Sequence, residues 1–287
     1  MGGNAVKISR PVTFEEAQAV VDYLKISLFP QLSLYESNYC ILGSYGKKLD
    51  GQTYGDIDIA VYLNDSIRED QDIKFLVDSL GYVGLQTKIN YGFKIVSFAC
   101  PIYLGRYDEK WYKDPSGFVQ VDLMITPSLE WSKFIYHSPN FRKNESQYKG
   151  LYRNILLMAL ITEPEKWITK ETPEGGIEEI EVNILRYPKG IYRVRKNFMG
   201  KKGLVKNGKN VEGSDTLITY EPGETIRMTV GSQYRISDID TFEKLWNIVL
   251  SEDFKWKNKR EDIVNRFIEC LGEQKLSLPK ELIEWKA

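Results

Sequence analysis

The run at residues 56–63 reads DIDIAVYL, and a second run at residues 118–125 reads FVQVDLMI. Successive side chains of a β-strand point to opposite faces, so each run has one unbroken aliphatic face. The acids of both runs fall on the other face: Asp56 and Asp58 in the first, Asp122 in the second. The two runs therefore predict strands with their aliphatic side chains toward a core and their carboxylates toward a cleft.

If the two strands are neighbours, the three carboxylates meet. Two unit charges about 4 Å apart repel by about 4 kcal/mol at an effective dielectric of about 20, so such a cluster calls for a counter-cation. Carboxylate oxygens select Mg2+ or Mn2+. The alternative is that the acids are solvated faces of edge strands, but Asp is depleted in strands. The pattern favours a divalent-metal site.

A glycine-rich turn precedes the first run, where residues 42–46 read LGSYG after an apolar stretch. Gly43 and Gly46 permit a tight turn that aims backbone N–H groups at an anion, and the Ser44 hydroxyl adds a donor. A Gly-Ser pair by itself also occurs in many ordinary loops. The turn becomes informative in combination with the acids that follow it.

The chain combines three motifs: a strand that ends in Gly-Ser, an Asp-x-Asp flanked by hydrophobic residues, and a distant Asp flanked in the same way. This combination resembles the nucleotidyltransferase superfamily. The superfamily includes DNA polymerase beta, poly(A) polymerases, CCA-adding enzymes and antibiotic nucleotidyltransferases. The resemblance covers residues 38–126. It implies that Asp56 and Asp58 bind two divalent ions, Mg2+ or Mn2+, and that Asp122 holds the ion that activates the acceptor. It also implies that Gly43 and Ser44 cradle the triphosphate of a nucleoside triphosphate such as ATP.

Two departures from the family concern the triphosphate. Gly55 stands where many members have Ser or Thr before the first acid, and Lys47 and Lys48 occupy a loop in which others often have Arg. The reaction implied by the resemblance is transfer of a nucleoside monophosphate to an acceptor with release of pyrophosphate.

The remaining chain predicts an α+β protein of two domains. Residues 1–140 are expected to form the catalytic domain, a mixed sheet with helices, and residues 141–287 a substrate-holding domain of helices and strands. A capping-box spacing from Thr13 to Glu16 predicts the first helix. Strand signals cover residues 177–236, where Pro222-Gly223 is predicted as a turn pair. Helical spacing is predicted at residues 146–161, 242–250 and 263–271.

Two groups of basic residues are candidate ligand contacts. On the helix at residues 146–161, Lys149 and Arg153 lie one turn apart, where related enzymes often present basic groups to the triphosphate; a solvated helix edge is the alternative. Residues 186–209 carry nine basic residues and no acid, with aromatic residues interleaved. This composition favours a phosphate-rich partner, although a solvated hairpin would also carry it. The predicted nucleic-acid contacts are Arg193, Arg195, Lys196, Lys201 and Lys202.

Composition sets the remaining limits. Lys+Arg 39 against Asp+Glu 40 leaves a net charge of -1, so attraction to nucleic acid must be local. No apolar run approaches the ~18 residues of a membrane span and the N-terminus lacks a signal pattern, so we expect a cytoplasmic protein without membrane contact. His137 is the only histidine, which argues against a zinc site.

Three functional hypotheses follow. The first is a metal-dependent nucleotidyltransferase whose acceptor is an RNA end, held by the basic segment. The second is the same chemistry on a protein or a small molecule. The third is a non-catalytic nucleic-acid-binding module built on a transferase core.

Overall fold

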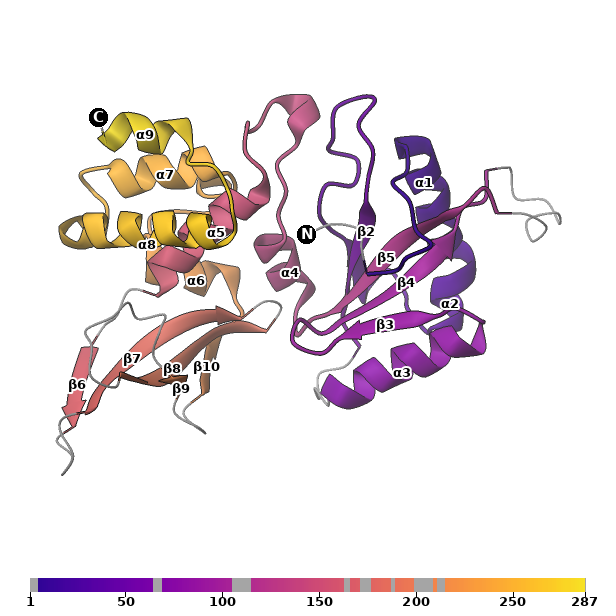
Figure 1. Ribbon diagram of the computed structural model, residues 1–287, viewed down its shortest axis with the longest axis horizontal. Helices are drawn as coiled ribbons and strands as arrows, with labels where there is room; N and C mark the ends of the chain where they lie inside the picture. Colours follow the sequence, from indigo (N-terminus) through magenta and orange to yellow (C-terminus); the bar gives the residue numbers. More distant parts are fainter. Residues whose placement is uncertain are drawn as a thin grey trace. The chain divides into compact units, whose positions relative to one another are not determined.

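The computed structural model describes residues 5–63, 69–104, 115–162, 166–170, 177–186, 189–198, 209–210 and 215–286. The chain divides into two compact units, Met1–Gln147 and Tyr148–Ala287 (Figure 1). The sequence predicts this boundary at residue 140, seven residues earlier. Both units mix helices with an antiparallel or mixed sheet, so the predicted α+β class is confirmed.

The first unit contains a mixed five-stranded sheet in the order β1-β2-β5-β4-β3. Strands β2 and β5 are parallel, and the other neighbouring pairs are antiparallel. The strands are β1 Tyr39–Ile41, β2 Asp56–Val61, β3 Thr87–Asn90, β4 Ile95–Pro101 and β5 Phe118–Ile125. The helices are α1 Phe14–Tyr23, a π-helical turn Leu24–Leu28, α2 Phe29–Gln31, α3 Glu69–Tyr82 and α4 Leu129–Ile135.

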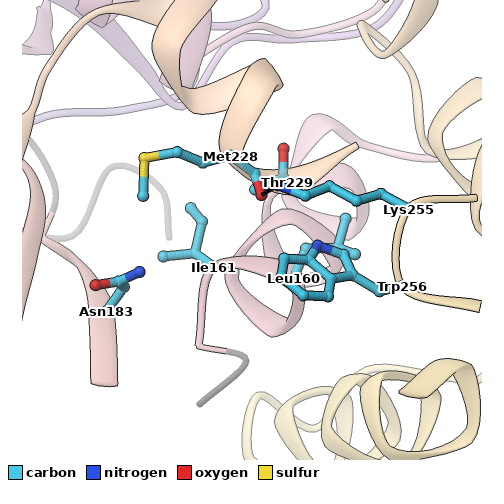
Figure 2. Close-up of a pocket in the computed structure, with 7 residues that line it drawn as sticks. All are labelled: Leu160, Ile161, Asn183, Met228, Thr229, Lys255 and Trp256. Carbon is cyan, nitrogen blue, oxygen red and sulfur yellow. Dashed lines mark hydrogen bonds between the residues drawn. The ribbon is translucent and has the colours of Figure 1, made fainter. Parts of the chain in front are cut away.

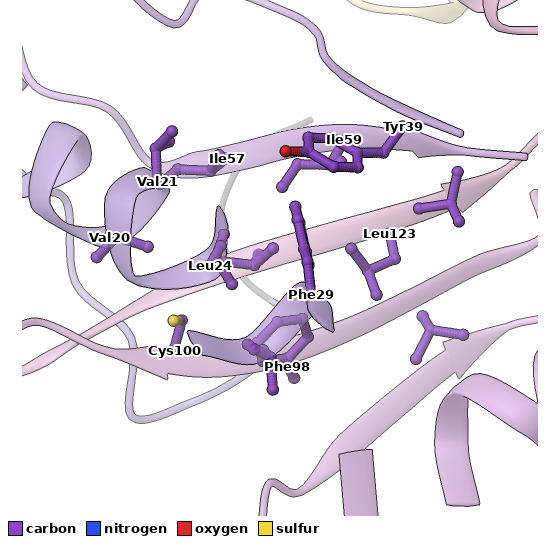
Figure 3. Packing of buried hydrophobic residues seen from close by; sticks show 14 of the residues in the cluster. Val20, Val21, Leu24, Phe29, Tyr39, Ile57, Ile59, Phe98, Cys100 and Leu123 are labelled. Atoms are coloured by element: carbon purple, nitrogen blue, oxygen red, sulfur yellow. The ribbon is translucent and has the colours of Figure 1, made fainter. Parts of the chain in front are cut away.

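The aliphatic faces of β2 and β5 form the core of this unit, as the alternation predicts. Their side chains pack with those of α1, α2 and α3 in one buried cluster. Figure 3 shows part of it, including Val21, Leu24, Phe29, Ile57, Ile59 and Leu123. Burying a Leu or Ile side chain contributes about 1.5–3 kcal/mol. The core therefore holds the two acid-bearing strands rigidly in place.

The opposite face of the sheet is divided along its length. Toward the ends of β2 and β5, Ala60 and Met124 form a small buried cluster with Leu42, against which Leu129 and Tyr136 pack. Helix α4 lies against β1 and β2 there. The acids occupy the first half of the same face, before this cluster begins.

Helix α1 begins with the predicted capping box. Thr13 Oγ1 accepts from Glu16 N at 3.3 Å, and Glu16 Oε2 accepts from Thr13 N at 3.0 Å. A cap of this kind contributes about 1 kcal/mol. It sets where the helix starts, immediately after Val12 pairs with Tyr54 in front of β2.

The second unit packs a group of helices beside a five-stranded sheet of order β10-β8-β7-β6 with β9 next to β8. Its helices are α5 Gly150–Ile161, α6 Pro222–Thr229, α7 Phe242–Leu250, α8 Arg260–Glu273 and α9 Lys280–Lys286. Its strands are β6 Lys166–Lys170, β7 Ile177–Arg186, β8 Gly190–Phe198, β9 Lys209–Asn210 and β10 Thr216–Thr219. Helix α5 packs against both α7 and α8.

The prediction of strands up to residue 236 is wrong at its end, because the last strand ends at Thr219. The Pro222-Gly223 pair, predicted as a turn between strands, begins helix α6. Proline is well suited to the first position of a helix because its missing N–H would have no partner there. Elsewhere, no helix within the described ranges is both long and apolar enough to cross a membrane.

Candidate metal centre

The three predicted acids meet on the half of the first sheet that lies beyond the cluster of Ala60 and Met124. In the parallel pairing of β2 with β5, Asp58 lies opposite Asp122, and Asp56 lies opposite Gln120. Each acid offers a carboxylate oxygen, and these oxygens all lie within 4.8 Å of one another. Strand register thus brings together acids that are 64 residues apart in the sequence.

The cluster is electrostatically strained without a cation. Burial, together with the neighbouring charges of Asp56 and Asp122, raises the pKa of Asp58 to about 7. Burial also raises the pKa of Asp122, while hydrogen bonds from Ser97 and Gln120 act in the opposite direction. A bound cation would remove the repulsion that raises these values. The donor set contains only oxygens, which fits Mg2+ or Mn2+.

Two polar residues that the sequence analysis did not single out surround Asp122. Gln120 Nε2 donates to Asp122 Oδ1 at 2.9 Å and to Oδ2 at 3.0 Å. Ser97 of β4 lies directly opposite Asp122 and hydrogen-bonds its carboxylate. The signal for Gln120 was available, because it lies two residues before Asp122 and therefore on the same face of the strand. Ser97 could be placed only once the pairing of β4 with β5 was known.

The glycine turn contacts the metal centre directly. Gly43 has φ +63°, and a Cβ built on it would come within 2.5 Å of Asp58 Oδ2. Leu42 N donates to Asp58 O at 2.8 Å, which fastens the turn to β2. Ser44 is the next residue of this turn, partly buried, and its carbonyl accepts from Lys47 N at 3.0 Å. The predicted triphosphate residues Gly43 and Ser44 thus lie beside the acid cluster.

The two lysines of the following loop stabilise the loop itself. Lys47 Nζ donates to Ser138 O at 2.9 Å, and burial lowers its pKa. Lys48 Nζ donates to Thr53 O at 2.7 Å and lies 4.9 Å from the centre of the Tyr54 ring. These contacts hold the chain that leads from the glycine turn to β2.

The other predicted triphosphate contacts belong to the second unit. Arg153 is fully buried there; its Nε donates to Ile239 O at 2.8 Å and its Nη1 to Asn154 Oδ1 at 2.9 Å. This placement argues against a triphosphate role, because the guanidinium is part of the packing between α5 and the chain before α7. Lys149 is exposed immediately before α5 and carries no side-chain cap of the helix.

Within the basic segment, strand β8 carries Arg193, Arg195 and Lys196, whereas Lys201 and Lys202 lie outside the described residues. Arg195 lies opposite Glu181 of β7, and Lys196 lies opposite Ile180. Arg193 Nε donates to Asn183 Oδ1 at 3.4 Å. Arg186 forms an ion pair with Asp215 at 2.5 Å. Acids from neighbouring strands therefore offset part of a positive charge that looks uncompensated along the sequence.

A small pocket of about 70 Å³ lies in the second unit (Figure 2). Its lining residues are Leu160, Ile161, Asn183, Met228, Thr229, Lys255 and Trp256. Pockets that hold nucleotide-sized ligands are typically about 300–1,000 Å³. This pocket is too small to be a nucleotide site.

No protein-family model and no curated protein sequence matches this chain. The fold and the site define a class of protein: an α+β protein with a candidate divalent-metal centre on two neighbouring strands of a mixed sheet.

Proposed function

We propose that the protein is a metal-dependent nucleotidyltransferase, which moves a nucleoside monophosphate from a nucleoside triphosphate to an acceptor and releases pyrophosphate. The observation that carries the proposal is the carboxylate cluster of Asp56, Asp58 and Asp122, with oxygens within 4.8 Å of one another on two parallel neighbouring strands. The resemblance of the Gly-Ser turn and of the acid spacing to the nucleotidyltransferase superfamily supports it.

The residues fit two divalent ions. Asp56 and Asp58 would hold them, with Asp122 on the side of the acceptor, and Gly43 and Ser44 would receive the triphosphate. Two bound Mg2+ or Mn2+ ions would supply stabilisation of the attacking and leaving oxygens in an in-line displacement at the α-phosphorus. In that displacement an acceptor oxygen bonds to the α-phosphorus, the bond to the pyrophosphate oxygen breaks, and the acceptor's proton passes to solvent water.

The protein's own contribution is positioning. The aliphatic faces of β2 and β5 are buried, so the acids project from strands that cannot shift without breaking the core. The tight turn at Gly43 abuts Asp58, and its backbone N–H groups and the Ser44 hydroxyl would be the donors to the triphosphate. Backbone donors in such a turn stabilise phosphate oxygens without a reorganisation cost.

An RNA end is the proposed acceptor, on the strength of the basic strand β8 with its aromatic neighbours. Two acids near the basic segment, Glu181 opposite Arg195 and Asp215 paired with Arg186, favour the second candidate, a protein or small-molecule acceptor. A purely nucleic-acid-binding module would not need three carboxylates clustered within 4.8 Å, which are costly without a catalytic or metal-binding role.

The test is a labelling experiment. The protein is incubated with Mg2+, each α-labelled nucleoside triphosphate in turn and a cell extract, and the label is sought in RNA, protein and small molecules. We expect label in one of these fractions from the wild type, and none from Asp58→Asn or Asp122→Asn. Equal labelling by the wild type and both variants would exclude this centre as the source of the transfer.

A further inference from the structure

The amide of Gln120 connects the metal centre to a distant part of the chain. Its Nε2 donates to both carboxylate oxygens of Asp122, at 2.9 and 3.0 Å. Its Oε1 accepts from the backbone N–H of Ala5 at 2.8 Å and of Val6 at 3.2 Å. The side chain is only 3% exposed. Both ends of the amide are therefore engaged, its NH2 group by Asp122 and its oxygen by the two backbone N–H groups.

The contacts on the Oε1 side determine which way the amide faces. Backbone N–H groups are donors only, so Ala5 and Val6 require an oxygen opposite them. The NH2 end of Gln120 must then face Asp122, a carboxylate that needs donors. The reverse orientation would place the amide oxygen against the carboxylate and the NH2 group against two N–H donors, which leaves every partner unsatisfied.

The chain after Val6 is held in place by further contacts. Arg10 N donates to Phe118 O at 2.9 Å, where β5 begins. Val12 and Tyr54 exchange backbone hydrogen bonds of 2.9 and 2.8 Å just before β2. The segment at residues 5–12 thus runs along the start of both acid-bearing strands, and its first two described residues orient Gln120.

We propose that Gln120 is a positioning residue for the metal centre, and that the docked backbone of Ala5 and Val6 sets the centre's metal affinity by fixing the Gln120 amide. The inference rests on the proposed metal centre. Gln120 holds the Asp122 carboxylate in one orientation and leaves its outward lone pairs to a cation. Partners of metal ligands in this position change metal affinity by about 10- to 100-fold when they are removed.

The experiment measures Mn2+ binding to the full chain by calorimetry and by electron paramagnetic resonance. Gln120→Met keeps the length of the side chain but removes the amide. Ala5→Pro with Val6→Pro removes the two backbone donors, and the matched control Ala5→Gly with Val6→Gly keeps them. We expect about 10- to 100-fold weaker Mn2+ binding for the methionine and proline variants, and near-normal binding for the glycine control.

A combined variant tests whether the two elements act as one. Gln120→Met together with the two prolines should bind Mn2+ no more weakly than Gln120→Met alone. The prolines lower Mn2+ affinity only by releasing the Gln120 amide, which the methionine variant already lacks. Thermal unfolding in EDTA shows whether a variant has lost metal affinity or has lost its fold. If Gln120→Met does not fold, Gln120→Asn replaces it, because the shorter amide cannot reach both Asp122 and the backbone of Ala5 and Val6.

The outcomes are distinguishable. Unchanged Mn2+ affinity in the Gln120 variant would overturn the positioning role, and unchanged affinity in the proline variant, or additive losses in the combined one, would overturn the role of the docked segment. A wild type that binds no Mn2+ would instead overturn the metal centre itself.

Discussion

Gly43 lies so close to Asp58 that residue 43 has no room for a side chain, since a Cβ there would come 2.5 Å from Asp58 Oδ2. The two residues lie on different sides of a loop, and a hydrogen bond from Leu42 N to Asp58 O holds them together. The turn that is proposed to receive the triphosphate and the carboxylate that is proposed to hold the metal are therefore one structural unit.

Gly43→Ala should weaken metal binding. The new methyl group would displace the Asp58 carboxylate, and the positive φ adds a backbone cost of about 1–2 kcal/mol. Gly46→Ala is the matched control, because Gly46 has φ +71° with nothing within 4 Å of its Cβ position. Urea unfolding should show a loss of stability for Gly46→Ala and at least as large a loss for Gly43→Ala, whereas Mn2+ calorimetry should show a loss of affinity for Gly43→Ala alone. Equal Mn2+ affinity in both variants would contradict the contact.

Asp58→Asn should abolish nucleotidyl transfer and stabilise the metal-free protein. The amide removes a buried charge that Asp56 and Asp122 repel, while transfer loses a metal ligand and should fall by orders of magnitude. Thermal unfolding in EDTA should give a higher Tm than the wild type at pH 8. A lower Tm would mean that the carboxylate contributes to the fold, and near-normal transfer by Asp58→Asn, Asp56→Asn and Asp122→Asn would refute the proposed triad.

The stability of the metal-free protein should fall as the pH rises from about 4 to about 7. The pKa of Asp58 is 3.8 in its ordinary state and about 7 in the fold. The folded state binds more protons in this window, so the stabilisation from protonated Asp58 is complete below pH 3.8 and is lost as the pH passes the folded pKa. The difference corresponds to an effect on the order of 4 kcal/mol. Urea unfolding in EDTA across this range measures it, and the slope should flatten in Asp58→Asn.

Metal binding near neutral pH should release protons. A cation binds the ionised carboxylates, so the proton held by part of the Asp58 population at pH 6–7 must leave. Mn2+ calorimetry in buffers with different ionisation enthalpies reports the number released. The apparent affinity should rise with pH up to about 7 and then level off. A pH-independent affinity would show that Asp58 is already ionised before the metal binds.

Ser44→Ala should weaken nucleotide binding moderately with every acceptor. A hydroxyl donor to a charged oxygen contributes about 1.5–3 kcal/mol, and the backbone amides of the turn remain. Ser79→Ala on α3 makes the same chemical change away from the glycine turn and should bind nucleotide normally. Titration with a non-hydrolysable nucleoside triphosphate decides the matter, and an unchanged Kd for Ser44→Ala would remove the hydroxyl from the site.

The acceptor hypothesis is tested on β8. Arg193→Ala with Arg195→Ala should lower RNA affinity and flatten its salt dependence, by about 0.7 in the log-log slope for each lost contact to a single strand. Adding Lys201→Ala and Lys202→Ala should extend the effect, and nucleotide affinity should be unchanged. Lys257→Ala with Lys280→Ala removes the same charge elsewhere in the second unit as a control. Filter binding at several salt concentrations measures the slopes, and equal slopes would move protein or small-molecule acceptors ahead of RNA.

Much of the first unit could be predicted because its signals are local. The alternation of β2 and β5 follows from side-chain geometry along a single strand, and the capping box of α1 from a spacing of three residues. The Pro222-Gly223 pair was predicted wrongly because the same dipeptide suits a turn and a helix start. Arg153 was assigned to a ligand because helical periodicity does not reveal that α5 is packed by both α7 and α8.

The sequence by itself determined that Asp56, Asp58 and Asp122 lie on the polar faces of two strands, since side-chain alternation is a property of each strand alone. Only the tertiary structure decided that Asp58 pairs in register with Asp122, that Gly43 abuts Asp58, and that Gln120 links Asp122 to the backbone of Ala5. It also decided that Glu181 faces Arg195, which changes the meaning of the basic segment. These relationships depend on which distant segments pair, and that choice is made by the burial of the whole core.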